Sequence, residues 1–424
     1  MLAVVTLAAV ALSFALALMS RGSSTSGARD PVVRYRFRPD PHAALLEQQI
    51  AFLEKKQLTA SLGAADLADL GKLYIGEAKR TGDLKWYDQA EGVAHQSLSA
   101  MKTSNPHAKM VLAQVEESRH QFPRAIDLAD EVLREKPSHL GALSVLITSN
   151  LALGNLAEAS HSAERLVNAR PDLSAYSQRA LVMAALGRNE EAVFDFRTGL
   201  SVEDFGEAQE SAFVRALLAR TYLRHGNLTA ADEAAREALR IIPDYPLALD
   251  LVGQVQEQTG DFQTATRSFD QAFTQSRQLL YLIHEARAAS HGDTPALGPQ
   301  LWAQAEALAR SEVKNNQYGH RLDLCRILLD AAPSAERAKE AVDLARQEIE
   351  LRQNAEVYFV LARALLQSGE LVAARRAIQE ALLSGAQEAE YFSVAAQIEK
   401  KLSNPSRANF YLKRAAETNP LGSE

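Results

Sequence analysis

The sequence predicts an all-α protein built from repeated pairs of antiparallel helices. Alanine recurs at a near-fixed step: Ala125, Ala159, Ala192, Ala231 and Ala265 lie 34, 33, 39 and 34 residues apart. Each alanine lies a few residues after a glycine or another turn signal, as expected where two helices are joined. Apolar residues make up 47% of the chain and aromatic residues only 6%, which favours alanine- and leucine-rich helices over strands.

Length and charge fit a repeat array. A chain of 424 residues would normally split into two or three domains, but a repeat array avoids that limit because each unit packs only against its neighbours. The net charge is −7, with Lys and Arg spread along the chain, which argues against nucleic-acid binding. The only cysteine, Cys325, excludes an intrachain disulfide and a thiolate metal site. It lies in an apolar pattern, and we expect it to be a small buried residue.

The N-terminus carries an uncharged segment, residues 2–19, interrupted only by Thr6 and Ser13. Its length is near the short end for a hydrocarbon layer about 30 Å thick. One interpretation is an uncleaved single-pass anchor. The other is a cleaved signal peptide with a small-x-small site at Ala15–Ala17. Both interpretations predict a membrane-associated protein of the cell envelope. The anchor would make it a single-pass membrane protein, and the signal peptide would make it an exported one.

The side of the membrane stays open. Five arginines between Arg21 and Arg38 follow the apolar segment, and the positive-inside rule then places the rest of the chain in the cytoplasm. A basic segment preceding the apolar run would reverse that assignment. We therefore divide the chain into an anchor or signal peptide (1–20), a flexible basic linker (21–41) and a repeat solenoid (42–424). The linker stretch 34–41 either touches anionic headgroups or is a solvated tether.

The helix pairs can be followed unit by unit. Residues 42–56 predict a lead-in helix, because their leucines and isoleucine fall on one helical face. In the clearest pair, the first helix places Gly253 towards its partner, and Gly260 breaks that helix. The second helix then presents Ala265, Phe269 and Ala272 as one stripe. The same offsets recur in 355–382 and 389–420.

This pattern resembles the tetratricopeptide repeat family over about 360 of the 424 residues. Gly253, Ala265, Phe269 and Ala272 match the family's small, small, large and small positions. The resemblance implies a right-handed superhelical solenoid of about ten helix pairs, TPR-like, with an N-terminal hydrophobic helix. Seven pairs are regular: 106–139, 140–172, 173–206, 212–245, 246–279, 355–388 and 389–422. Three are degenerate: 64–105, 278–315 with a long connection over 291–299, and 317–353.

No catalytic or cofactor motif accompanies the repeats. The phosphate-binding, dinucleotide-binding and nucleophile-elbow glycine patterns do not occur in the sequence. His284-Glu285 is not followed by a second histidine at zinc-site spacing. Acidic pairs fall on predicted helix surfaces, where they solvate the chain. We therefore predict a protein that is not an enzyme and has no cofactor and no metal site.

The resemblance also implies a binding surface. In this family the first helix of each pair lines a concave groove, and four positions per helix point into it. The chaperone-tail carboxylate clamp of some family members uses Lys and Asn at fixed positions, and this sequence lacks them. The groove positions either contact a ligand or merely solvate the groove. Carried onto this chain, the candidates are His107, Met110, Gln114, Glu117, Phe213, Arg220, Asp250, Gln254, Glu257, Glu356, Phe359 and Arg363.

The predicted function is a non-catalytic protein–protein interaction scaffold. It would be tethered to a membrane through residues 2–19 and would hold a partner protein or extended peptide in the groove, without nucleic acid. The alternative is a self-associating structural assembly module of the cell envelope. The sequence leaves the oligomeric state open.

Overall fold

A computed structural model describes residues 42–59, 61–81, 83–204, 208–292, 296–314 and 320–421. The chain divides into two units, Met1–Arg36 and Phe37–Glu424, and every described residue belongs to the second unit. The expected anchor or signal peptide (1–20) and basic linker (21–41) lie outside the described residues. Within the described part, every helix falls short of the length and apolar character needed to cross a membrane.

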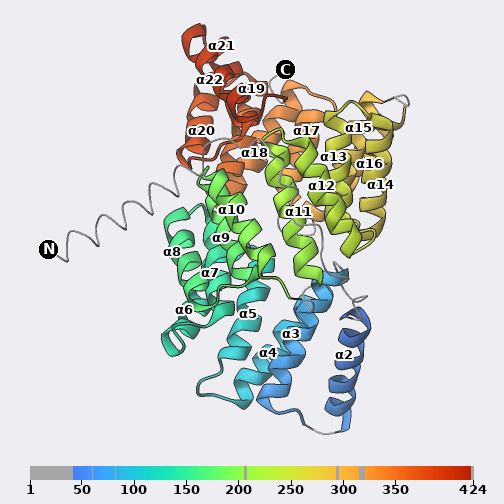
Figure 1. Ribbon diagram of the computed structural model, residues 1–424, viewed down its shortest axis with the longest axis vertical. Helices are drawn as coiled ribbons and strands as arrows, with labels where there is room; N and C mark the ends of the chain where they lie inside the picture. The colour runs from blue at the N-terminus through green and yellow to red at the C-terminus, as the bar shows by residue number, and fades with distance from the viewer. Residues whose placement is uncertain are drawn as a thin grey trace, which may run out of the picture. The chain divides into compact units, whose positions relative to one another are not determined.

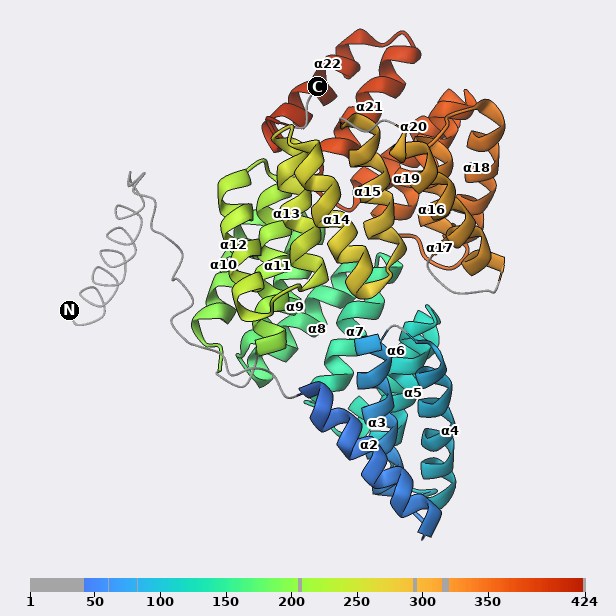
Figure 2. The same cartoon turned by 90° about the vertical axis from the view of Figure 1, so that its right-hand side faces the viewer.

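All regular secondary structure in the described ranges is helical, which confirms the predicted all-α class (Figures 1 and 2). The lead-in helix is α2 (His42–Thr59). Short turns then join each first helix to a second helix, and neighbouring pairs pack in chain order. The first five pairs are α3 (Ala64–Thr81) with α4 (Lys85–Ala100), α5 (Pro106–Ser118) with α6 (Phe122–Glu135), α7 (Leu140–Leu153) with α8 (Leu156–Ala169), α9 (Leu173–Ala185) with α10 (Asn189–Ser201), and α11 (Ala208–Arg224) with α12 (Leu228–Ile241).

Five further pairs complete the described array and confirm the predicted number of about ten. Among the described residues the last helix is α22, which ends just before Pro420. These pairs are α13 (Pro246–Gln258) with α14 (Phe262–Ser276), α15 (Leu279–His291) with α16 (Leu297–Lys314), α17 (His320–Asp330) with α18 (Ala335–Ile349), α19 (Ala355–Ser368) with α20 (Leu371–Leu383), and α21 (Ala389–Lys401) with α22 (Pro405–Thr418).

Small side chains hold the helix pairs together, as the repeat step predicts. Ala159, Ala265 and Ala374 are all fully buried. At Gly253 the first helix approaches the ring of Phe269 so closely that an added Cβ would lie 2.6 Å from its Cε1. A helix can approach its partner this closely only where it carries a glycine or alanine at the point of crossing. A larger residue there would overpack the crossing, at about 1–3 kcal/mol.

The 39-residue step between Ala192 and Ala231 has a structural cause. Helix α11 begins at Ala208, before the expected residue 212, and a longer connection precedes it. Glu203 in that connection accepts two hydrogen bonds from the guanidinium of Arg215, at 2.7 and 2.9 Å. Glu203 therefore ties the described start of this connection to α11 through a buried ion pair.

Two other details differ from the sequence-based expectation. The connection expected over 291–299 is shorter, because α16 begins at Leu297 and takes Pro299 into its first turn, where the missing N–H costs nothing. Leu412 matches a core position of the repeat but is 48% exposed. Among the described residues α22 is the last helix, so no following pair covers that side chain.

Turns of the earlier pairs contact loops of the later ones. The Asn354 side-chain amide donates to the carbonyl of Ala152 at 2.8 Å, across 202 residues. The chain comes closest at Gly187, where an added Cβ would lie 2.0 Å from the carbonyl oxygen of Gly385. We call these contacts the long-range seam. It joins residues 152–154, 186–187 and 224–226 to residues 353–354, 385–388 and 418–420.

Candidate concave-face binding site

The twelve candidate groove residues all lie on first helices of pairs. They come from α5, α11, α13 and α19, and their exposure divides them into three groups. Three are exposed: His107, Phe213 and Glu356. Six are half-buried: Gln114, Glu117, Arg220, Gln254, Glu257 and Arg363. Three are buried and belong largely to the core: Met110, Asp250 and Phe359.

Several candidates bond to the next first helix along the array. The two guanidinium nitrogens of Arg287 each donate to a carboxylate oxygen of Glu257 at 2.8 Å. Arg326 donates to Glu356, and Arg363 to Asp330, each through one guanidinium nitrogen. The partners lie 30, 30 and 33 residues apart, close to the repeat step. These side chains therefore fix the register between repeats as well as lining the surface.

Asp250 lies at the centre of a buried polar network. It is 2% exposed, accepts a hydrogen bond from Gln254 at 2.7 Å, and its other oxygen lies 2.6 Å from Nδ1 of His284. The imidazole also packs against Phe269, with ring centroids 5.4 Å apart. A buried carboxylate needs such partners to offset its lost hydration. Asp250 and His284 thus connect two repeats and leave little of either group open to a ligand.

An aromatic contact connects the last two pairs. Phe359 on α19 stacks on Tyr391 of α21, with ring centroids 4.4 Å apart. The guanidinium of Arg363 lies 5.9 Å from the Phe359 ring centroid, within the range of a cation–π contact. Burial raises the pKa of Tyr391 well above its usual value, so its hydroxyl stays protonated at neutral pH.

The long-range seam brings charges from distant repeats into one neighbourhood. Arg224 on α11 donates to the carboxylate of Glu388 at 2.7 Å, across 164 residues. The Glu356 side chain is partly open to solvent. Loss of hydration from the groups around it acts to raise its pKa, but Arg326, Arg352 and Arg224 outweigh this effect and hold that pKa below its usual value. Glu356 on α19 therefore stays ionised beside α11. The sequence carries no signal of this proximity, because the repeat step relates only neighbouring units.

Arg220 lies in the same neighbourhood. Loss of hydration lowers the pKa of its guanidinium to about 10, and the positive charge of Arg224 lowers it further. The carboxylates of Glu388, Glu356 and Asp250 act in the opposite direction. Two predicted groove positions on other pairs, Asp250 and Glu356, thus act electrostatically on a third, Arg220.

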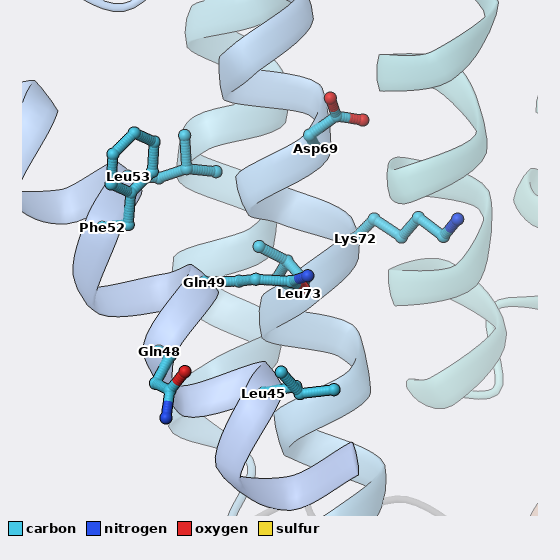
Figure 3. Close-up of a pocket in the computed structure, with 8 residues that line it drawn as sticks. All are labelled: Leu45, Gln48, Gln49, Phe52, Leu53, Asp69, Lys72 and Leu73. Carbon is cyan, nitrogen blue, oxygen red and sulfur yellow. The ribbon is translucent and has the colours of Figure 1, made fainter. Parts of the chain in front are cut away.

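A hollow that the sequence analysis did not identify lies between α2 and α3. It has a volume of about 470 Å³. Its lining comes from both helices, with Gln49, Phe52 and Leu53 on α2 and Leu73 on α3 among the residues drawn in Figure 3. Phe52 is 66% exposed. An aromatic side chain this open next to a hollow is a candidate contact for another protein surface.

The described residues bring together no group of three or more metal-ligating side chains. Cys325 is fully buried, as predicted, and its thiol donates to the carbonyl of Ala341 at 3.4 Å. Burial raises the pKa of this thiol to about 12, and a thiol that stays protonated is a poor nucleophile and metal ligand.

Comparison with known proteins places the repeats in a class. A tetratricopeptide repeat model matches residues 214–245, which span most of α11 and all of α12. That match and the described helix pairs agree with the resemblance stated above. Residues 214–245 are thus similar to a tetratricopeptide repeat, and the described helix pairs form a solenoid of that type. No curated protein matches the sequence.

Three solved structures illustrate the likeness of fold. PilW, a type IV pilus biogenesis factor, is 16% identical, with a TM-score of 0.42 over 48% of this chain and 94% of PilW. TTC0263, a thermophilic TPR protein of Thermus thermophilus, is 23% identical, with a TM-score of 0.39 over 46% of this chain and 98% of its own. A human IFIT1 dimer with PPP-AAAA is 13% identical, with a TM-score of 0.47 over 90% and 95%.

Proposed function

We propose that this protein is a non-catalytic scaffold that binds a partner protein or extended peptide along its first helices. The repeat class supports an interaction scaffold. The observation that carries the proposal is that predicted groove positions bond across successive first helices, as Glu257 does to Arg287 and Arg363 to Asp330, so that charges from several repeats form one surface. A surface assembled from several repeats offers a ligand many shallow contacts and a specific order of charges.

A site-specific crosslinking experiment tests this proposal in cells. A photoreactive phenylalanine analogue replaces Phe213, which is 41% exposed on the first helix α11. A matched variant carries the same analogue at Phe194, which is 66% exposed on the second helix α10. We expect a discrete protein adduct from position 213 and none from position 194. Equal adducts from both positions, or none from position 213, would contradict the proposal.

We also propose that residues 2–19 attach the scaffold to a membrane. The support is the uncharged apolar sequence itself. N-terminal sequencing of the mature chain would separate an anchor from a cleaved signal peptide, and protease accessibility in intact cells would give the side. Release of an uncleaved chain by alkaline carbonate extraction would disprove the tether.

Self-association is a second candidate, favoured by the ends of the array. Phe410 and Leu412 on α22 are 59% and 48% exposed, and the hollow beside Phe52 lies at the other end. An apolar helix face on one copy and a hollow on another form a head-to-tail contact that does not close on itself. Light scattering of the detergent-solubilised chain should then show a mass that rises with concentration, and Leu412→Glu should abolish the rise. A strict monomer at high concentration excludes this candidate.

A further inference from the structure

Arg220 differs from the other arginines on the first helices. Among those whose side chains the structure describes, it is the one without a hydrogen bond or ion pair to another described residue. Each of the others has a carboxylate partner. These pairs are Arg179 with Asp195, Arg215 with Glu203, Arg224 with Glu388, Arg287 with Glu257, Arg321 with Glu348, Arg326 with Glu356, and Arg363 with Asp330.

The nearby carboxylates are already engaged. Asp250 bonds to Gln254 and His284. Glu388 accepts from Arg224, and Glu356 accepts from Arg326. The five N–H donors of the Arg220 guanidinium therefore remain available. Its loss of hydration, visible in the pKa of about 10, still leaves it charged at neutral pH.

A desolvated cation without a hydrogen-bonded partner is costly, and an incoming anion would offset that cost. A guanidinium presents a planar fork that matches a carboxylate in two parallel hydrogen bonds. Arg220 is only half-buried, so part of its side chain remains open to a ligand. Its position on α11, one turn before the seam residue Arg224, places it where two sections of the array meet.

We infer that Arg220 anchors a carboxylate of the partner polypeptide bound along the first helices. This inference rests on the proposed scaffold function and specifies the chemistry of the partner. A single carboxylate fits better than a nucleic-acid backbone. The negative charges of Asp250, Glu356 and Glu388 act on Arg220, and they would repel a run of phosphates more strongly than a single carboxylate. The carboxylate belongs either to an Asp or Glu side chain or to a chain terminus.

Peptide selection tests the anchor. The full-length chain in detergent is panned against a random peptide library fused through its C-terminus, so that only side-chain carboxylates are displayed. The wild type should enrich Asp or Glu at one fixed position. Arg220→Gln should weaken binding of the selected peptides about tenfold to hundredfold, the loss expected for a hydrogen-bonded charge pair. Arg220→Glu should instead select Lys or Arg at that position.

Matched variants separate recognition from folding. Arg236→Gln removes an exposed arginine of α12 that pairs only with Asp232 one turn away, and it should leave binding unchanged. Arg220→Lys keeps the charge without the fork and should retain part of the affinity, even if Arg220→Gln were to fold poorly. Synthetic peptides with free-acid and amidated ends then compare a terminal carboxylate with a side-chain one.

The outcomes distinguish the anchor from the scaffold. If the wild type enriches no library peptide and binds no synthetic peptide with a free-acid end, the proposed function fails together with the anchor. If peptides are selected without an acidic residue, or bind Arg220→Gln as tightly as the wild type, the anchor alone is wrong. Binding of poly-uridine that depends on Arg220 would also overturn it, in favour of a phosphate ligand.

Discussion

Two turns of the long-range seam and two turns elsewhere in the array have the same local structure but different surroundings. Gly154 and Gly187 take φ values of 85° and 73°, and Gly260 and Gly369 take 82° and 88°. All four follow a first helix. An added Cβ would lie 2.7 Å from the Gln353 carbonyl at Gly154 and 2.0 Å from the Gly385 carbonyl at Gly187. At Gly260 and Gly369 it would meet nothing within 4 Å.

The comparison shows that one residue type serves two purposes. At Gly260 and Gly369, glycine is needed because a left-handed backbone is strained for any other common residue. At Gly154 and Gly187, it also allows two sections of backbone to meet. A repeat array is expected to depend on neighbour contacts alone, and the seam adds a long-range connection to that arrangement.

Replacing the seam glycine should have the largest effect. We expect Gly187→Ala to cost about 2–5 kcal/mol, because it adds overpacking against Gly385 to the strain of a left-handed alanine. Gly260→Ala should cost only the strain, about 1–2 kcal/mol. Thermal unfolding gives the ranking, and hydrogen exchange of residues 383–388 shows whether the seam has opened. Equal melting temperatures for the two variants would mean that the seam contributes nothing.

His120 should make the stability of the fold depend on pH. Burial, together with the charges of Arg352, His320 and Arg321, lowers the pKa of His120 to about 4, against the opposing charge of Glu348. The folded protein therefore favours the neutral imidazole. This contribution is fully present above about pH 6.5, the unfolded value, and is lost as the pH falls through 4.

We expect the difference in stability between wild type and His120→Gln to shrink by about 2–3 kcal/mol between pH 7 and pH 4. The comparison with the variant cancels the many carboxylates that titrate in the same range. His320 should behave in the opposite way. Glu312 raises the pKa of His320, so the contribution of His320 to stability grows as the pH falls. Denaturant midpoints at several pH values measure both, and parallel pH profiles for wild type and His120→Gln would refute the effect.

Asn354 caps a helix and also bonds across the seam, so its variants separate these two contributions to stability. The side chain of Asn354 accepts from the backbone N–H of Val357 at 3.1 Å and donates to the Ala152 carbonyl across the seam. We expect Asn354→Ala to cost about 2 kcal/mol, a cap and a hydrogen bond together. Asp261→Ala, which removes a cap of α14 without a seam bond, should cost about 1 kcal/mol.

Asn354→Asp refines this measurement, because it keeps the cap acceptor and loses the seam donor. We expect an intermediate loss, about 1 kcal/mol, with increased hydrogen exchange at residues 152–156 but not at Val357. A loss equal to that of Asn354→Ala would assign the whole effect to the seam bond and none to the cap, and no loss at all would assign it to the cap.

The sequence predicted the local architecture because the signals are local. The step between Ala159 and its counterparts follows from close helix crossings, and those alanines are indeed buried. The placement of the groove candidates on first helices follows from the same periodicity. The seam could not be predicted, because Gly187 and Gly369 look alike in sequence and differ only in what lies opposite. A periodic pattern encodes the relation between neighbours, not between pairs some 200 residues apart.

The candidate site shows the same limit. The pairing of Glu257 with Arg287 could have been found from opposite charges one repeat apart. That rule also assigns Asp250, 30 residues on, to Arg220. The structure instead gives Asp250 to His284 and Gln254, because a buried carboxylate takes the partners that best replace its water. Which arginine is left without a partner is thus decided by packing.

The ion pair across the seam should have the smallest effect. Arg224 and Glu388 lie 2.7 Å apart, but half of the Arg224 side chain is exposed, and exposed pairs contribute about 0–1 kcal/mol. We expect Arg224→Ala to cost about 0.5 kcal/mol at low salt and nothing measurable at about 1 M salt, where screening is short-ranged. Arg236→Ala, which breaks a pair within one helix, should behave alike in thermal unfolding. Only Arg224→Ala should alter hydrogen exchange at residues 385–388. A salt-independent loss of several kcal/mol would instead mean that backbone contacts alone do not hold the seam and that this ion pair secures it.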